Sequence, residues 1–130
     1  MKPNPVVHFE LPAENKKRMV DFYVKTFGWK AEHLGSENNY VVVSTTETEK
    51  GRPKNPGAIN GGIYQKTEDM GEQHPSVVIA VDDIHEHMKK VEHAGGKILG
   101  KPMEIPHVGI YVSFVDTEGN RLSMLQPKGM

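Results

Sequence analysis

A histidine and a glutamate lie two residues apart in the first apolar run of the chain, Val6 to Leu11 (VVHFEL). Alternate residues of a strand point to opposite faces, so the two side chains share a face and lie roughly 6.6 Å apart along it. The imidazole of His8 and the carboxylate of Glu10 could hold a ligand by hydrogen bonds, or act as a base with its orienting acid. The alternative is a polar pair that is satisfied by Arg121 or Tyr111.

The last apolar run of the chain carries a small hydroxyl, Ser123. Asp116 to Pro127 reads DTEGNRLSMLQP, which indicates a turn that uses Gly119, followed by a strand. In that strand Leu122 and Met124 share one face. Ser123 points to the other face, together with Arg121 and Leu125.

The elements that must position these side chains occur twice. The run from Val6 to Leu11 and the run Ser76 to Val81 (SVVIAV) are alternating and rich in β-branched residues, which is typical of strands. A helix is expected after each run, near residues 15–27 and 83–94, and we expect both helices on one side of the sheet.

Capping residues mark the start and the end of both expected helices. Asn15 can cap the first helix and Gly28 ends it. Asp83 and Glu86 have capping-box spacing at the start of the second helix, and Gly95-Gly96 ends it. The apolar residues of the first helix have helical spacing and are expected to face the core: Met19, Phe22, Tyr23 and Phe27. Those of the second helix are Ile84, Met88 and Val91.

Two further strand pairs complete the repeat: 40–45 with 58–65, and 110–115 with 120–126. The sequence therefore predicts an α+β fold of two tandem β-α-β-β-β modules within one domain of residues 1–130. Module one spans about residues 4–66, the linker about 67–74 and module two about 75–127. The charged loop 46–57 is interpreted either as a solvated hairpin or as a lid over a pocket.

Composition excludes several classes of function. A net charge of -1 at pH 7 gives no basic excess for nucleic acid or an anionic membrane. The chain has no cysteine, which excludes thiol catalysis, disulfides and zinc-thiolate sites. Because no long apolar run or signal peptide is present, we expect a soluble, cytoplasmic protein.

The repeated modules, together with HFELPAENKKRMVDFYVKTFGW early and DTEGNRLSMLQP late, resemble the glyoxalase, bleomycin-resistance and extradiol-dioxygenase superfamily, the vicinal oxygen chelate proteins. The resemblance covers essentially the whole chain. It implies an open, curved eight-stranded half-barrel with helices on the convex side, a cavity on the concave side, and a homodimer. The predicted ligand-binding cavity is lined by His8, Glu10, Trp29, Ser76, Val78, Tyr111, Ser113, Arg121, Ser123 and Leu125.

The resemblance also implies where a divalent metal would be held in this family. The first matching ligand position is His8, the second falls in INGGI (59–63), and the third and fourth fall on Ser76 and Ser123. Serine hydroxyls are weak ligands for divalent metals and Gly61-Gly62 offers none. We therefore predict no metal cofactor, with His8, Glu10 and His74 as the candidate ligands if a metal is present after all.

Three functions stay open from the sequence. The first is a metal-independent small-molecule binding protein, or an enzyme of unknown reaction, on the glyoxalase-like fold. The second is a metal-dependent glyoxalase-type lyase, isomerase or dioxygenase that uses His8 with improvised ligands. The third is a module that mainly associates with a partner chain. The identity of the ligand and the catalytic residues, if any, are not predicted.

The metal prediction can be tested directly. Protein purified without added metal should contain far less than one equivalent by elemental analysis, and a chelator should leave its melting temperature unchanged. Restoring the family pattern with Ser76→His and Ser123→Glu should create metal affinity that His8→Ala abolishes. Stoichiometric zinc, nickel, iron or manganese bound through His8 in the unmodified protein would contradict the prediction.

Overall fold

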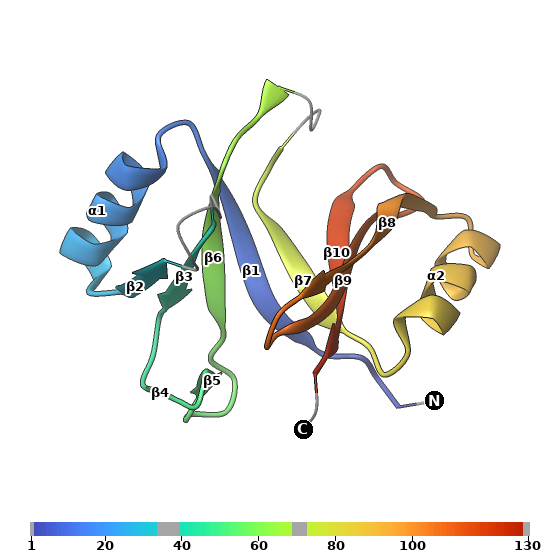
Figure 1. Cartoon of the computed structure of the whole chain (residues 1–130), viewed down its shortest axis with the longest axis horizontal. Helices are drawn as coiled ribbons and strands as arrows, with labels where there is room; N and C mark the ends of the chain where they lie inside the picture. The colour runs from blue at the N-terminus through green and yellow to red at the C-terminus, as the bar shows by residue number, and fades with distance from the viewer. Residues whose placement is uncertain (1, 34–39, 69–72, 129–130) are drawn as a thin grey trace. The chain divides into compact units, whose positions relative to one another are not determined.

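A computed structural model describes residues 2–33, 40–68 and 73–128 of the chain (Figure 1). By internal contacts it divides into two compact units, and the chain passes from one to the other within its first strand. The first unit is His8–Pro75. The second unit combines Met1–Val7 with Ser76–Met130.

The first unit is a four-stranded sheet with one helix. It contains β1 (Val6–Ala13), α1 (Lys16–Phe27), β2 (Lys30–His33), β3 (Tyr40–Ser44) and β6 (Asn60–Gln65). The strand order is β2-β3-β6-β1, in which β1 is parallel to β6 and the other pairs are antiparallel. Strand β1 is two residues longer than predicted, because Pro12 and Ala13 still pair with Tyr64 and Gln65.

The second unit repeats this plan. It contains β7 (Ser76–Ala80), α2 (Ile84–His93), β8 (Lys97–Ile105), β9 (Gly109–Val115) and β10 (Arg121–Pro127). The order is β7-β10-β9-β8, with β7 parallel to β10 and the other pairs antiparallel. The predicted α+β fold of two β-α-β-β-β modules is confirmed.

The loop 46–57 contains a small antiparallel ribbon of β4 (Thr48–Glu49) and β5 (Arg52–Pro53). Its two central residues, Lys50 and Gly51, both have positive φ, as a tight hairpin turn with the hand of the strand twist requires. The loop therefore contains a short hairpin.

Both helices begin as the sequence predicts. The Asn15 side chain accepts a hydrogen bond from the Arg18 N–H, and the Asp83 side chain accepts one from the Glu86 N–H. At the end of α1, Gly28 has φ 71° and donates its N–H to the Val24 carbonyl.

A second cap comes from the last strand of each module, and sequence reasoning missed it. The Gln65 side-chain oxygen accepts from the Lys16 N–H at 3.1 Å, and the Gln126 oxygen accepts from the Ile84 N–H at 3.0 Å. Each glutamine thereby ties a helix N-terminus to the last strand of its module. The signal that could have found it is a glutamine near the end of both strands.

Each unit has its own core between helix and sheet. The buried core of the first unit is Ala13, Val20, Val41, Val43 and Ile63. The buried core of the second unit is Val81, Ile84, Val112, Phe114 and Met124. Phe9 and Leu11 in β1, and Ile79 and Leu122 in the second unit, pack against these clusters.

The predicted inward face of α1 is partly wrong. Met19 and Tyr23 pack against the core, but Phe22 is 54% exposed and Phe27 is 61% exposed. Val20 occupies the buried position instead. The helix is short and its sheet is only four strands wide, so one stripe of residues covers the core and the flanking aromatic residues remain outside it.

Gly61 in β6 makes room for an aromatic ring. It pairs with Phe9, and a Cβ added at Gly61 would overlap the Phe9 ring. Phe9 in turn contacts Trp29 at a centroid distance of 5.6 Å, so the glycine supports the aromatic part of the core.

We expect Gly61→Ala to lower the free energy of unfolding by about 1–3 kcal/mol, because the added methyl must displace the Phe9 ring. Phe9→Leu also costs stability by itself, but combined with Gly61→Ala it should recover part of the loss. Denaturant titration of the two single variants and the double variant measures this coupling. Strictly additive losses would show that the glycine does not serve the ring.

Candidate functional site

His8 and Tyr40 form a hydrogen-bonded pair on the face of the first unit's sheet that lies opposite α1. The Nε2 atom of His8 lies 2.8 Å from the Tyr40 hydroxyl, and the two rings are inclined by only 15°. The neighbours Val41 and Phe9 belong to the core on the other face. Sequence reasoning placed His8 on this face but missed Tyr40, because the pairing register of β3 cannot be read from the sequence.

Gly62 lets the tyrosine reach the histidine. It is paired with Glu10 in β1 and with Val42 in β3. A Cβ added at Gly62 would overlap the ring and hydroxyl of Tyr40, so the ring lies directly over this glycine. The two adjacent glycines of β6 therefore accept one ring on each face of the sheet.

Burial makes His8 a neutral side chain. Removal of the imidazole from water lowers its pKa from 6.5 to about 4. Among the described residues, its side chain makes no other hydrogen bond than the one to Tyr40. At neutral pH, His8 therefore offers an uncharged ring nitrogen, Nδ1, which can donate to or accept from a ligand according to its tautomer.

Two further polar side chains lie beside His8. Glu10, two residues along β1, is only 8% exposed, and Asn60, the partner of His8 in β6, is 7% exposed. Asn60 accepts from the Thr45 N–H and donates to the Thr48 hydroxyl, both at 2.9 Å. Thr48 belongs to β4, so the hairpin is anchored at the strand position next to His8.

The second unit holds a cluster of three hydroxyls. The Ser123 oxygen lies 2.6 Å from the Tyr111 hydroxyl and 3.0 Å from the Ser113 hydroxyl. Ser123 is 3% exposed and Ser113 is 8% exposed. The predicted common face of these residues is confirmed. Ser123 thus uses its hydrogen-bonding capacity within its own unit.

The remaining predicted residues of the second unit take their expected strand positions. Val78 in β7 pairs with Ser123 and is 2% exposed, and Leu125 pairs with Tyr111. Arg121 begins β10, and Ser76 begins β7. That these residues line one cavity with His8 and Glu10 stays a prediction.

The sequence predicted Trp29 on the face that carries His8, and this prediction is wrong. Trp29 packs against the α1-side core and stacks on Tyr23, with ring centroids 4.5 Å apart and an interplanar angle of 10°. The physical reason is that Phe9 and Tyr23 offer the indole an apolar, aromatic contact that the polar face lacks.

Four other histidines lie outside β1. His74 is exposed just before β7, and His85 is exposed on α2. His87, also on α2, is half-buried, and its Nε2 lies 3.2 Å from the Asn4 side-chain oxygen. His107 follows a proline in a turn closed by Val108 and Ile105, with φ 67°.

The donors present do not fit the metal site that the resemblance implies. His8 is hydrogen-bonded to Tyr40, Ser123 is bonded to two hydroxyls, and the glycines at 61 and 62 accept rings. Within the described ranges, no three histidine, aspartate or glutamate side chains are grouped closely enough to hold a metal ion.

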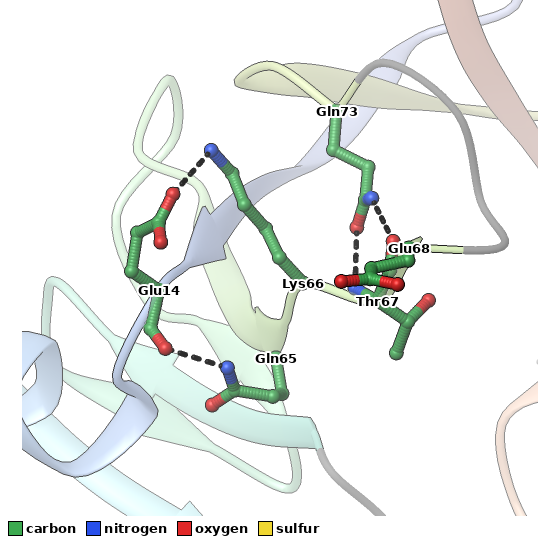
Figure 2. A pocket seen from close by; sticks show the side chains of 6 residues that line it. All are labelled: Glu14, Gln65, Lys66, Thr67, Glu68 and Gln73. Carbon is green, nitrogen blue, oxygen red and sulfur yellow. Dashed lines mark hydrogen bonds and ion pairs between the residues drawn. The ribbon is translucent and has the colours of Figure 1, made fainter.

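A polar depression of about 260 Å³ lies at the far end of β6 (Figure 2). Gln65 donates to the Ala13 and Glu14 carbonyls, and Gln73 bonds both backbone groups of Thr67. The Lys66 ammonium lies 3.4 Å from Glu14. These contacts tie the end of β6 to Glu14, and Thr67 to Gln73.

The low pKa of His8 predicts an acid-sensitive fold. The unfolded chain binds a proton at this histidine below about pH 6.5, whereas the folded chain resists it down to about pH 4. Stability should therefore be full at neutral pH and fall by about 3 kcal/mol as the pH drops through this window. His8→Gln should flatten this part of the profile, and the exposed His85→Gln should not. Equal profiles for both variants would contradict the assignment.

The structure resembles solved proteins at low sequence identity. Methylmalonyl-CoA epimerase in complex with methylmalonyl-CoA and NH4+ aligns with a TM-score of 0.69 at 13% identity, over 97% of this chain and 96% of that one. A hypothetical protein from Bacillus halodurans C-125 aligns with a TM-score of 0.68 at 14% identity, over 99% of this chain and 98% of that one. These likenesses show the fold.

Sequence comparison shows the family. A glyoxylase-like domain-containing protein of Didymella fabae is 33% identical over 114 residues, which cover 85% of this chain and 84% of that protein. The putative glyoxylase CFP32 of Mycobacterium bovis is 28% identical over 91% of this chain, which spans only 42% of its length. A sequence model of the Glyoxalase/Bleomycin resistance protein/Dioxygenase superfamily matches residues 6–124. The chain therefore belongs to the glyoxalase, bleomycin-resistance protein and dioxygenase superfamily.

Proposed function

We propose that the chain binds a small organic molecule on the His8 face of the first unit, without a divalent metal, either as a binding protein or as an enzyme whose reaction is unknown. The observation that carries this proposal is the half-buried, neutral His8 held by Tyr40 over Gly62. The family membership supports a small-molecule ligand.

The site offers oriented hydrogen bonds rather than a metal or a nucleophile. The Tyr40 contact fixes the imidazole, and Nδ1 remains for a ligand. A ligand group with a carbonyl or hydroxyl suits this nitrogen, since a neutral imidazole can act as donor or acceptor. A histidine with a pKa of about 4 is a weak base at neutral pH, so His8 serves to bind and orient rather than to abstract a proton.

Glu10 is the residue of the same face that could handle a proton. It carries a carboxylate two residues from His8 along β1, and it is buried. If the chain is an enzyme, this geometry fits a mechanism in which the His8 imidazole orients the substrate and the Glu10 carboxylate transfers the proton. The methylmalonyl-CoA epimerase structures share the fold alone, so their substrate is not assigned to this chain.

We expect a screen of small carbonyl and hydroxy compounds to give ligands that raise the melting temperature and shift the His8 ring signals in NMR spectra. Tyr40→Phe and His8→Gln should weaken binding of such a ligand about 10-fold or more, because each removes or misplaces one hydrogen bond at a half-buried site. Glu49→Gln on the exposed hairpin is the matched control. Ligands that bind equally well to all four proteins, the unmodified chain included, would place the binding site elsewhere.

A further inference from the structure

The edge strand β2 is unusually open to solvent. It forms one side of the first unit's sheet and pairs with β3, and all four of its residues, Lys30–His33, are exposed. An edge strand presents backbone N–H and C=O groups that another strand can bind. Proteins often protect such an edge with charged side chains, and β2 carries Lys30 and Glu32.

The charges of β2 are complementary to a second copy of β2. Lys30 and Glu32 point to the same face, on either side of Ala31. In an antiparallel pair, residues that lie opposite each other point to the same face of the sheet. A two-fold axis perpendicular to the sheet must therefore set one residue opposite the same residue of the second copy. Centred on Ala31, the pairing sets each Lys30 opposite Glu32 of the second copy, and the two alanines meet without a clash.

Centres on the two charged residues are unfavourable. An axis at Lys30 or at Glu32 would set two like charges directly opposite each other, which is destabilising. The two Lys–Glu pairs therefore favour Ala31 over both of these centres.

Exposed apolar surface adjoins this edge on the α1 side. Ala31 pairs with the core residue Val43, so its methyl group lies on that side. Trp29 directly precedes β2, and its ring lies 6.4 Å from the ring of Phe27, which is 61% exposed. A second copy of β2 would extend the sheet beside these rings and reduce their exposure, which adds an apolar contribution to the charge pairs.

We propose that two copies of the chain associate through β2, antiparallel and centred on Ala31, so that the sheet of the first unit continues from one copy into the other. This inference does not depend on the proposed ligand site. It commits the homodimer expected from the sequence to one named surface.

Charge reversal tests the surface. Lys30→Glu or Glu32→Lys alone makes all four facing charges alike and should weaken the dimer about 10- to 100-fold in sedimentation equilibrium. The double variant restores opposite charges and should restore the dimer, and a mixture of the two single variants should form the heterodimer. Lys50→Glu and Glu49→Lys, on the exposed hairpin of the same unit, are controls of equal charge change.

Cross-linking tests the register. The chain has no cysteine, so Ala31→Cys introduces a single thiol. In the proposed pair the two thiols face each other at a distance suited to a disulfide, and mild oxidation should give a covalent dimer. Glu47→Cys is the exposed control and should not. A species of 14.5 kDa at every concentration, or a dimer that no charge reversal weakens, would overturn the proposal.

Discussion

Two adjacent positions without a side chain in β6 determine how the first unit is built. Gly61 receives the ring of Phe9 on the α1 side, and Gly62 receives the ring of Tyr40 on the opposite side. From Phe9 the aromatic contacts continue to Trp29 and into α1. From Tyr40 a hydrogen bond continues to His8. Core packing and the polar site therefore both depend on the same pair of glycines, one on each face of a single strand.

The two units share a plan but differ in what they place at the equivalent polar face. Gln65 and Gln126 cap the two helices in the same way, which shows how closely the modules repeat. The first unit then sets an imidazole against a phenol, whereas the second unit sets two serine hydroxyls against a phenol. The two units thus share the contacts that hold the fold and differ in the side chains that could do chemistry.

The sequence predicted the parts of the structure that follow from local pattern. Asn15 and Asp83 cap their helices because a short polar side chain at that position meets free N–H groups, and this needs no tertiary information. The alternation in β10 correctly divided Met124 from Ser123. These predictions depend on only a few neighbouring residues.

The errors lie where distant segments meet. Tyr40 and His8 are 32 positions apart, and only the register of β3 on β6 brings them together. Trp29 was assigned to the wrong face because the residue after a helix can turn either way, and its contacts with Phe9 and Tyr23 decide the outcome. Phe22 and Phe27 fit a helical period, but the width of the sheet limits how much of that period is covered.

Trp29, which stacks on Tyr23, provides an intrinsic fluorescence probe of the first unit. The sequence has a single tryptophan, and that tryptophan lies wholly within the contacts of the first unit. Its emission therefore reports the environment of one unit, while far-ultraviolet circular dichroism reports the strands and helices of both. A comparison of the two signals during denaturation distinguishes a chain that unfolds as one cooperative body from one whose halves separate in stages.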